Sequence, residues 1–265
     1  MSIKSVVLTL GLLCLGASIA SACTMRDQKT RLWVSECTSD SQGFSNLNLS
    51  NRLLPHSYIA HSDYQHVRWV DSDLSKSTIQ YVTLRRSLLK GMTLEYVNFN
   101  HSYFVGVTFD HVKMMHSNFN HTDFPGSYMG HVNFTEANLN HANISKANLA
   151  HSNFALANVN WVDFSGSLLQ KTTFAHANVN HVDFSHATLK HVDFSYANMN
   201  GDNFTFAKIN NMKFKSARLC DTTFAGAKIN DLMTSLKAAK SICGVTLPNG
   251  KKLMTDCVGK AKVCP

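Results

Sequence analysis

The sequence predicts an all-β solenoid, and three observations support that prediction. Large apolar or aromatic residues stand at every fifth position from Phe44 to Ile229, 38 times without a gap. A small residue stands two positions before most of them, as at Ala137, Ala142 and Ala147. Neither the helical period of 3.6 nor the strand period of two would keep this series in phase, so five residues form one structural unit. One large and one small inward residue per unit are accommodated if each unit forms one side of a square coil.

The units A-N-L-N-H, A-N-I-S-K and A-N-L-A-H, at residues 137–151, resemble the pentapeptide-repeat family, whose motif is A-(D/N)-L-x-x. The resemblance covers about 186 of the 265 residues. It implies a right-handed quadrilateral β-helix, in which four units make one coil and residues 20 apart stack. At a strand spacing of about 4.8 Å, nine and a half such coils would be roughly 45 Å long. Distorted coils are expected where the small residue is replaced, at Gln42, Leu47, Arg52, Met92, Asp202 and Met212.

Residues 1–22 have the pattern of a secretory signal peptide. Lys4 is their only charge, Val6 to Ile19 is an apolar run, and Ala20-Ser21-Ala22 is a small-residue cleavage site. The pattern predicts export to the periplasm or the extracellular space, and no later apolar segment is long enough to span a membrane. An uncleaved anchor is one alternative. Lipidation of Cys23 is another, although Ala20 stands where lipoproteins usually carry Leu.

Cysteine usage agrees with export. Without residues 1–22 the chain keeps six cysteines, an even number, as expected for disulfides in an oxidising compartment. We expect Cys23 to pair with Cys37. The other four allow three connectivities, of which Cys243–Cys257 is favoured because the Pro248-Asn249-Gly250 turn lies midway between them. The six predicted disulfide cysteines are Cys23, Cys37, Cys220, Cys243, Cys257 and Cys264.

An open solenoid exposes its core and unpaired backbone at both ends, so caps are expected. The repeat is predicted to span residues 44–231, between an N-terminal cap at 23–43 and a disulfide-linked C-terminal cap at 232–265. Residues 32–34, Leu-Trp-Val, would cover the first end.

The C-terminal cap is predicted to contain a helix and a hairpin. Asp231 would cap the helix and Gly244 would end it. A hairpin would follow around Asn249-Gly250. The helix residues expected to share a buried face are Leu232, Leu236 and Ala239.

Charge and motifs exclude several function classes. The net charge is +8, yet residues 23–231 carry 18 basic against 16 acidic side chains, and the excess lies in the last 34 residues. A basic stripe is absent apart from Arg85, Arg86 and Lys90, so no nucleic-acid partner is expected. The best-known family members protect DNA gyrase with an acidic, DNA-like surface, a role that a nearly neutral, exported cylinder fits poorly. No phosphate loop, zinc-protease helix or nucleophile elbow occurs, so we predict neither an enzyme, nor catalytic residues, nor an organic cofactor.

All 14 histidines occupy one phase of the repeat, two residues after the large position, which the family fold places outward at a corner. The simple interpretation is that this corner tolerates polar residues, because Lys, Gly, Asn and Tyr also occur there. The functional interpretation is a column that binds zinc or another divalent metal between two imidazoles, or that responds to pH because protonation stacks like charges. The candidate metal ligands are His101, His121 and His141 on one side, and His111, His131 and His151 on the opposite side.

We therefore expect an exported, non-enzymatic rod that serves as a structural module or binds a protein or glycan outside the cell. A metal-binding or pH-responsive histidine surface is the alternative, and gyrase-type inhibition is the third. The partner and the oligomeric state stay open.

Overall fold

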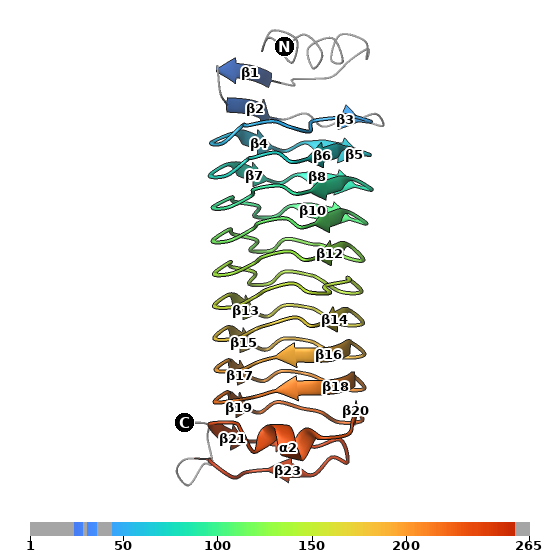
Figure 1. Ribbon diagram of the computed structural model, residues 1–265, viewed down its shortest axis with the longest axis vertical. Coiled ribbons are helices and arrows are strands. Elements are labelled where there is room, and N and C mark those ends of the chain that lie inside the picture. The colour runs from blue at the N-terminus through green and yellow to red at the C-terminus, as the bar shows by residue number, and fades with distance from the viewer. Residues whose placement is uncertain (1–23, 29–30, 36–43, 258–265) are drawn as a thin grey trace.

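Over the residues that the structure describes, the chain forms one long rod of stacked coils, a β-solenoid of about nine turns with one short helix near the C-terminal end of the rod (Figure 1). The computed structural model describes residues 24–28, 31–35 and 44–257, with side chains for 44–257. The predicted signal peptide and Cys23, Cys37 and Cys264 lie outside the described residues. The predicted fold class is confirmed.

Each five-residue unit contributes a short strand or a single bridge, and its neighbours lie 20 residues away on either side. Val159 pairs in parallel with Val179, and Val179 with Met199. The backbone N–H of Phe154 donates to the carbonyl of Thr173 in the next coil at 2.8 Å. Interior coils are therefore hydrogen-bonded to two neighbours, and only the two ends of the stack would have unpaired backbone if they were not capped.

The strands assemble into five stacks along the rod and one terminal hairpin. Three stacks lie in the N-terminal half. The first contains β1 (Thr24–Gln28), β2 (Arg31–Ser35), β4 (Tyr58–Ala60) and β7 (Thr78–Gln80), and the second contains β3 (Phe44–Ser45), β5 (Asp63–Gln65), β8 (Thr83–Arg85) and β10 (Tyr103–Val105). The third contains β6 (Arg68–Val70), β9 (Leu88–Lys90), β11 (Thr108–Asp110) and β12 (Tyr128–Gly130). In the C-terminal half the stacks are β13 (Asn158–Asn160), β15 (Asn178–Asn180), β17 (Asn198–Asn200), β19 (Arg218–Cys220) and β21 (Ser241–Cys243); and β14 (Leu168–Gln170), β16 (Thr188–Asp193), β18 (Lys208–Lys213) and β20 (Lys228–Ile229). The hairpin is β22 (Val245–Thr246) with β23 (Lys252–Leu253).

At the N-terminal end, β1 and β2 form an antiparallel hairpin, and β2 pairs in parallel with β4 of the first coil. The backbone of this hairpin therefore occupies an edge that the solenoid would otherwise leave open.

The core is a stack of rings and aliphatic side chains in alternating columns. Phe154 and Phe174 are stacked with ring centroids 4.8 Å apart, while Phe164 meets both edge-on at 5.8 Å. Val159 and Leu169, on the sides between them, are fully buried as well. Two ring columns and two aliphatic columns thus fill the narrow square, an arrangement that suits both ring geometry and close packing.

The coils at Met92 and Asp202 are not distorted, contrary to the sequence prediction. Met92 is fully buried, and parallel pairing continues beside it from Thr93 to Lys113 and beside Asp202 from Asn203 to Thr223. A methionine can follow the space available because its side chain is unbranched and flexible. At Met212 the change is slight, since the chain stays extended through β18. Gln42 lies outside the described residues.

Asp202 takes the place of a serine in a bonding pattern that recurs along the rod. Ser87 accepts the N–H of Val67, one coil earlier, at 3.0 Å, and Asp202 Oδ1 accepts that of Val182 at 2.9 Å. The other carboxyl oxygen, Oδ2, is buried without a hydrogen-bond partner. Burial raises the pKa of Asp202 well above its usual range, and the bond from Val182 offsets only part of that effect.

The C-terminal cap differs from the prediction in its helix. Helix α2 covers only Leu232–Leu236, and the Asp231 side chain makes no capping bond. The longer helix is wrong because residues 241–243 form β21, which continues the solenoid by pairing with β19. Gly244 does not end the helix. It occupies the next corner, at a φ of +70°, where a Cβ would collide with Asp221.

The rest of the cap follows the prediction. Leu232 and Leu236 are buried against the last coil, and β22 and β23 form the expected hairpin. Cys243 and Cys257 form a disulfide with their Cα atoms 4.9 Å apart, the pairing that the sequence favours. Cys220 is disulfide-bonded as well. Among the described residues, no helix has the length and apolarity needed to cross a membrane.

Candidate functional site

The histidine phase is the corner of the coil, and its backbone is left-handed throughout. Every residue of this phase from Asn46 to Gly226 has a φ between +46° and +71°. Glycine adopts this conformation freely, and Asn, Asp and His are several-fold enriched there among the other residues. The corner thus explains in part why histidines gather in this phase and no other.

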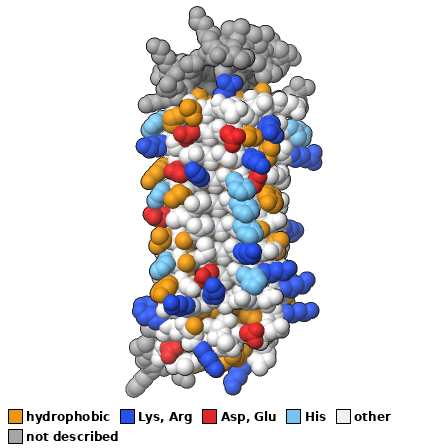
Figure 2. Space-filling model, in the orientation of Figure 1, with side chains coloured by type: hydrophobic (Ala, Val, Ile, Leu, Met, Phe, Trp, Pro, Cys, Tyr) orange, Lys and Arg blue, Asp and Glu red, His pale blue; other side chains and the backbone are white. Residues whose placement is uncertain are grey.

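Each coil has four corners, and corner residues of successive coils stack, so the rod carries four columns of corner side chains. Figure 2 shows one row of histidines running along the rod. Column A, named here for the residues that share one corner, consists of His61, Tyr81, His101, His121, His141, Trp161 and His181. Its seven rings form one continuous stack, with centroids 4.1–6.4 Å apart and planes within 16° of parallel.

Column B, at the diagonally opposite corner, contains His111, His131 and His151, whose centroids lie 4.5 and 4.7 Å apart. Asp110 Oδ1 lies 2.6 Å from His111 Nδ1, and its other oxygen lies 3.0 Å from Lys90 Nζ. The hydrogen bond from Lys90, helped by His111, lowers the pKa of Asp110.

The two remaining corners mix rings with other side chains. In column C, which includes Tyr96, His116, Glu136, Leu156, His176 and Tyr196, the tyrosines stack on histidines at 4.6 Å. His116 Nδ1 lies 3.3 Å from Glu136 Oε2. In column D, His186 stacks on Phe206 at 5.5 Å.

The structure brings together the histidines predicted as metal ligands, three in column A and three in column B, but stacks their rings. Neighbouring imidazoles are 4.5–5.2 Å apart. An imidazole nitrogen binds zinc through a lone pair that lies in the plane of the ring. The lone pairs of two parallel, stacked rings therefore do not converge on one ion, and a stacked pair must turn out of its stack to chelate. Residues 44–257 contain no group of three or more side chains placed to hold a metal.

Bulky apolar side chains occupy several corners, whereas the sequence-based interpretation recognised tyrosine there only as a tolerated polar residue. Trp161 is 56% exposed and Phe206 is 58% exposed, and Tyr81, Tyr96, Leu156 and Tyr196 are also exposed. All six have φ near +60°. For such side chains this conformation is strained, so the backbone preference that accounts for His, Asn and Gly does not account for them.

One flat side of the rod is rich in asparagine. Between columns C and A, the sequence Asn-x-Asn recurs in six consecutive coils, at residues 98–100, 118–120, 138–140, 158–160, 178–180 and 198–200. We call these twelve residues the asparagine face. The recurrence of Asn-x-Asn every 20 residues is visible in the sequence. The sequence-based predictions did not include it, because they concerned only the core and corner positions of the repeat.

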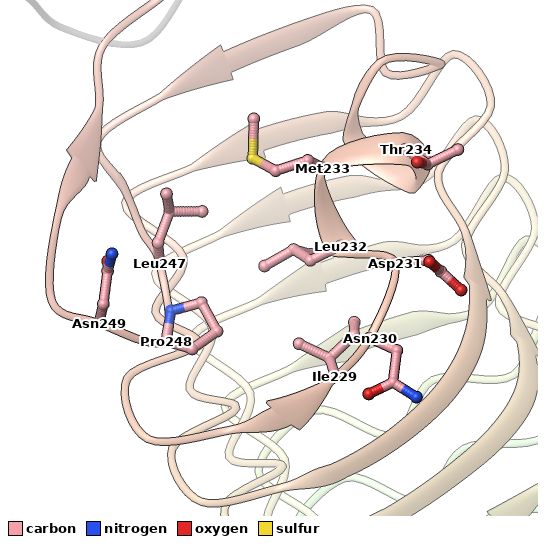
Figure 3. A pocket seen from close by; sticks show the side chains of 9 residues that line it. All are labelled: Ile229, Asn230, Asp231, Leu232, Met233, Thr234, Leu247, Pro248 and Asn249. Carbon is pink, nitrogen blue, oxygen red and sulfur yellow. The ribbon is translucent and has the colours of Figure 1, made fainter.

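A hollow of about 280 Å³ lies at the C-terminal end, between the last coil, α2 and the hairpin (Figure 3). Ile229, Leu232, Met233, Leu247 and Pro248 supply most of its lining. Asp231 is its single ionisable side chain, so it holds no acid–base pair of the kind that catalysis uses.

Two family models match the chain: the pentapeptide repeat region over residues 88–154, and eight copies of pentapeptide repeats over residues 167–201. No curated protein sequence matches it.

Solved structures of similar fold include HetL, a pentapeptide-repeat protein involved in heterocyst differentiation regulation in the cyanobacterium Nostoc. It is 17% identical, with 81% of this chain and 94% of HetL covered and a TM-score of 0.40. They also include QnrB1, a plasmid-mediated fluoroquinolone resistance protein, at 16% identity, 73% and 94% coverage, and a TM-score of 0.42. A third is a thylakoid-lumen pentapeptide-repeat protein of Arabidopsis thaliana, at 22% identity, 48% and 84% coverage, and a TM-score of 0.32.

The five-residue period and the 20-residue pairing between coils run along the rod, and the two family models match within it, at residues 88–154 and 167–201. The chain is a pentapeptide-repeat protein.

Proposed function

We propose that the chain is an exported, non-catalytic recognition rod that binds a partner through the corner columns and the face between them. The observation that supports this most directly is the set of exposed, bulky residues at left-handed corners. A left-handed backbone costs a non-glycine residue roughly 1–2 kcal/mol, and the ring stacking within the columns, at about 0.5–1.5 kcal/mol per pair, offsets only part of that cost for side chains that stay exposed. Five of the six lie in columns A and C, along the two borders of one side of the rod, and this gathering on one side supports a binding face there.

The non-catalytic part of the proposal rests on the repeat. The same combinations of Ser, His and Asp recur from coil to coil, and no copy among the described residues is set apart by a cavity of its own. Pentapeptide-repeat proteins generally act as structural or binding modules, which supports the same conclusion.

Export is supported by the predicted signal peptide together with the disulfide chemistry of the cap. The Cys243–Cys257 bond and the bonded state of Cys220 suit an oxidising compartment, because cytosolic thiols are kept reduced. We propose the periplasm or the extracellular space as the location.

Affinity capture tests the proposal. The mature protein is compared with the triple variant Tyr81→Asn, Trp161→Asn and Tyr196→Asn, because asparagine tolerates the corner backbone. The control carries His131→Asn and His151→Asn, at the same phase but in column B. We expect the triple variant to lose the partners that the wild type and the control retain. Identical capture by all three proteins would refute the proposal.

A pH response is a second candidate, favoured by the stacked imidazoles 4.5–5.2 Å apart. Protonation of neighbours places like charges at that spacing, where they repel even in water. The check is capture repeated at about pH 7.5 and about pH 5.5, on either side of the range in which histidine changes charge. Equal capture at both values would remove this candidate.

Metal binding and gyrase-type inhibition are not supported in the same way. Zinc would have to break ring stacks that the fold forms without it. The repeat carries nearly balanced charge, where a DNA-like surface would be acidic.

A further inference from the structure

We propose that the asparagine face binds a neutral, extended polysaccharide chain laid along the rod. The inference rests on the proposed recognition function and names the chemistry of its partner. The face consists of the strands β13, β15 and β17 and the three coils before them, stacked in parallel along the rod (Figure 1).

In the first three pairs, the first asparagine has a structural explanation. Asn138 Oδ1 accepts the backbone N–H of Asn140 at 3.2 Å, and the equivalent bond recurs at Asn98 and Asn118. The same local bond is made on other sides of the coil, for example by Asn143. This row is therefore a property of the repeat and carries little information about a ligand.

The second asparagine does not make that local bond, and its contacts run between coils, as where Asn140 Oδ1 accepts the backbone N–H of Asn160 at 3.1 Å. On the neighbouring side of the same coils this phase is occupied by Ser145, Ser165 and Ser185. In the whole repeat, asparagine takes this phase six times on the asparagine face and otherwise only at Asn210 and Asn230. The backbone at this phase does not require an amide, so the six-fold recurrence on one side points to the surface.

Three of the six second asparagines, at 140, 160 and 180, are held in order and keep donor capacity for a ligand. Asn100 Oδ1 is buried without a hydrogen-bond partner and is not accessible to a ligand. Asn160 Nδ2 donates to Asn140 Oδ1 at 2.9 Å, and Asn180 Nδ2 donates to Asn160 Oδ1 at 2.6 Å. In the other row, Asn178 Nδ2 donates to Asn158 Oδ1 at 2.9 Å. An amide has two N–H donors and two acceptor lone pairs, so one donor per side chain is left over after each ladder bond. A fixed, repeated set of donors and acceptors matches a ligand with repeated hydroxyl and amide groups.

The charge of the asparagine face and the aromatic rings along its two borders indicate the class of ligand. From corner to corner across the six coils, Glu136 is the only side chain with a fixed charge. Rings line both borders, among them Trp161 in column A and Tyr96 and Tyr196 in column C. An uncharged face would gain nothing from a polyanion, whereas hydrogen-bonding amides beside aromatic rings suit a neutral sugar chain.

The extent of the face indicates a polymer. Six strands at about 4.8 Å span about 24 Å along the rod, much longer than one sugar ring. Because each coil repeats the same groups, a chain with repeating units can make the same contacts several times, which raises its affinity through multiple weak contacts.

The experiment uses the mature protein on an array of neutral and charged glycans, with pull-down on insoluble chitin and cellulose. The test variant is Asn140→Ala, Asn160→Ala and Asn180→Ala, which removes both partners of the ladder bonds among them. The matched control is Ser145→Ala, Ser165→Ala and Ser185→Ala, at the same phase in the adjacent side. Circular dichroism establishes that both variants keep the solenoid.

We expect the wild type and the serine control to bind at least one neutral glycan, and the asparagine variant to bind it at least about tenfold more weakly. Binding should persist in about 0.5 M salt, because screening weakens charge contacts only. Absence of binding to every neutral glycan, unchanged binding by the asparagine variant, or binding confined to heparin and abolished by salt would each overturn the inference. If proteins are still captured through Tyr81, Trp161 and Tyr196 while no glycan binds, the recognition function stands and this inference alone fails.

Discussion

Phe174 offers a sharp test of the core. Its ring is fully buried, stacked on Phe154 and Phe194 at 4.8 and 5.0 Å and in edge contact with Phe164 and Phe184 at 5.8 and 5.9 Å. Phe174→Ala removes all four ring contacts and leaves a cavity inside a closed square. Buried Phe→Ala changes cost about 3–5 kcal/mol, and the walls here are tied to both neighbouring coils, so we expect about 4 kcal/mol.

Phe206 provides the matched control, because the same change of residue occurs at an exposed, left-handed corner. Its ring is 58% exposed, contacts His186 on one side, and lies over Gly226 on the other. Phe206→Ala loses little buried area and keeps an L-residue at the corner. We expect a change within about 0.5 kcal/mol.

Urea unfolding followed by circular dichroism measures both free energies. With a slope of about 3 kcal/mol per molar urea, a loss of 4 kcal/mol lowers the midpoint by more than about 1 M, while the control shifts it by under about 0.2 M. Comparable midpoint shifts for the two variants would refute the assignment of the inward and corner phases.

Three further predictions concern the buried carboxyl, the register and the corners. Because burial holds the folded-state pKa of Asp202 above its unfolded value, the stability that its neutral form supplies is present at low pH and is lost as pH rises above about 4. Asp202→Asn keeps an acceptor for the N–H of Val182, so it should raise the melting temperature at neutral pH and flatten its pH dependence. An unchanged pH profile of the melting temperature would contradict this. One residue inserted after Ala150 shifts every later core residue out of phase and should abolish much of the β signal in circular dichroism. One residue inserted after Gly250, in the exposed turn of the cap, should be tolerated. Equal melting temperatures of the two insertion variants would disprove the solenoid register. Leu156→Asn should stabilise the rod by up to about 1 kcal/mol because asparagine accepts the left-handed corner more readily, and a loss of stability would show that Leu156 packs usefully.

Most of the rod could be predicted because one period specifies it. The phase of Phe154, Val159 and Phe164 determines which residues face inward, and the coil then determines which residues stack. The period also overstated how much a large residue at the small inward position disturbs the coil. A methionine at a small position, as at Met92, looked disruptive in the motif but packs within the coil, since side-chain flexibility is not visible in a pattern of residue sizes.

The C-terminal end could not be predicted because the period is interrupted there. Helix α2 lengthens the step between stacked positions from 20 residues to 23, so Cys243 lies under Cys220 and Gly244 lies next to Asp221. Strand β21 is three residues long, too short to show any periodicity of its own. The weak likeness of Leu219-Cys220 to Ile242-Cys243 was the available signal, and the more familiar pattern of a capped helix obscured it.

The surface phases of this fold differ in how much they say about function. At the corners the left-handed backbone favours histidine, asparagine and glycine, so their presence there says less about function than that of Trp161 and Phe206, which stand against that preference. At the phase just after the core residue the strand is extended and accepts Ser, Ala, Lys or Gln alike, so a residue type that recurs there on one side alone reflects something other than backbone geometry. The second asparagine recurs in six consecutive coils of the asparagine face and elsewhere only at Asn210 and Asn230, whereas the histidines occupy a phase that the backbone itself favours. Function is therefore better sought along this flat side and its aromatic borders than in the imidazoles that first draw attention in the sequence.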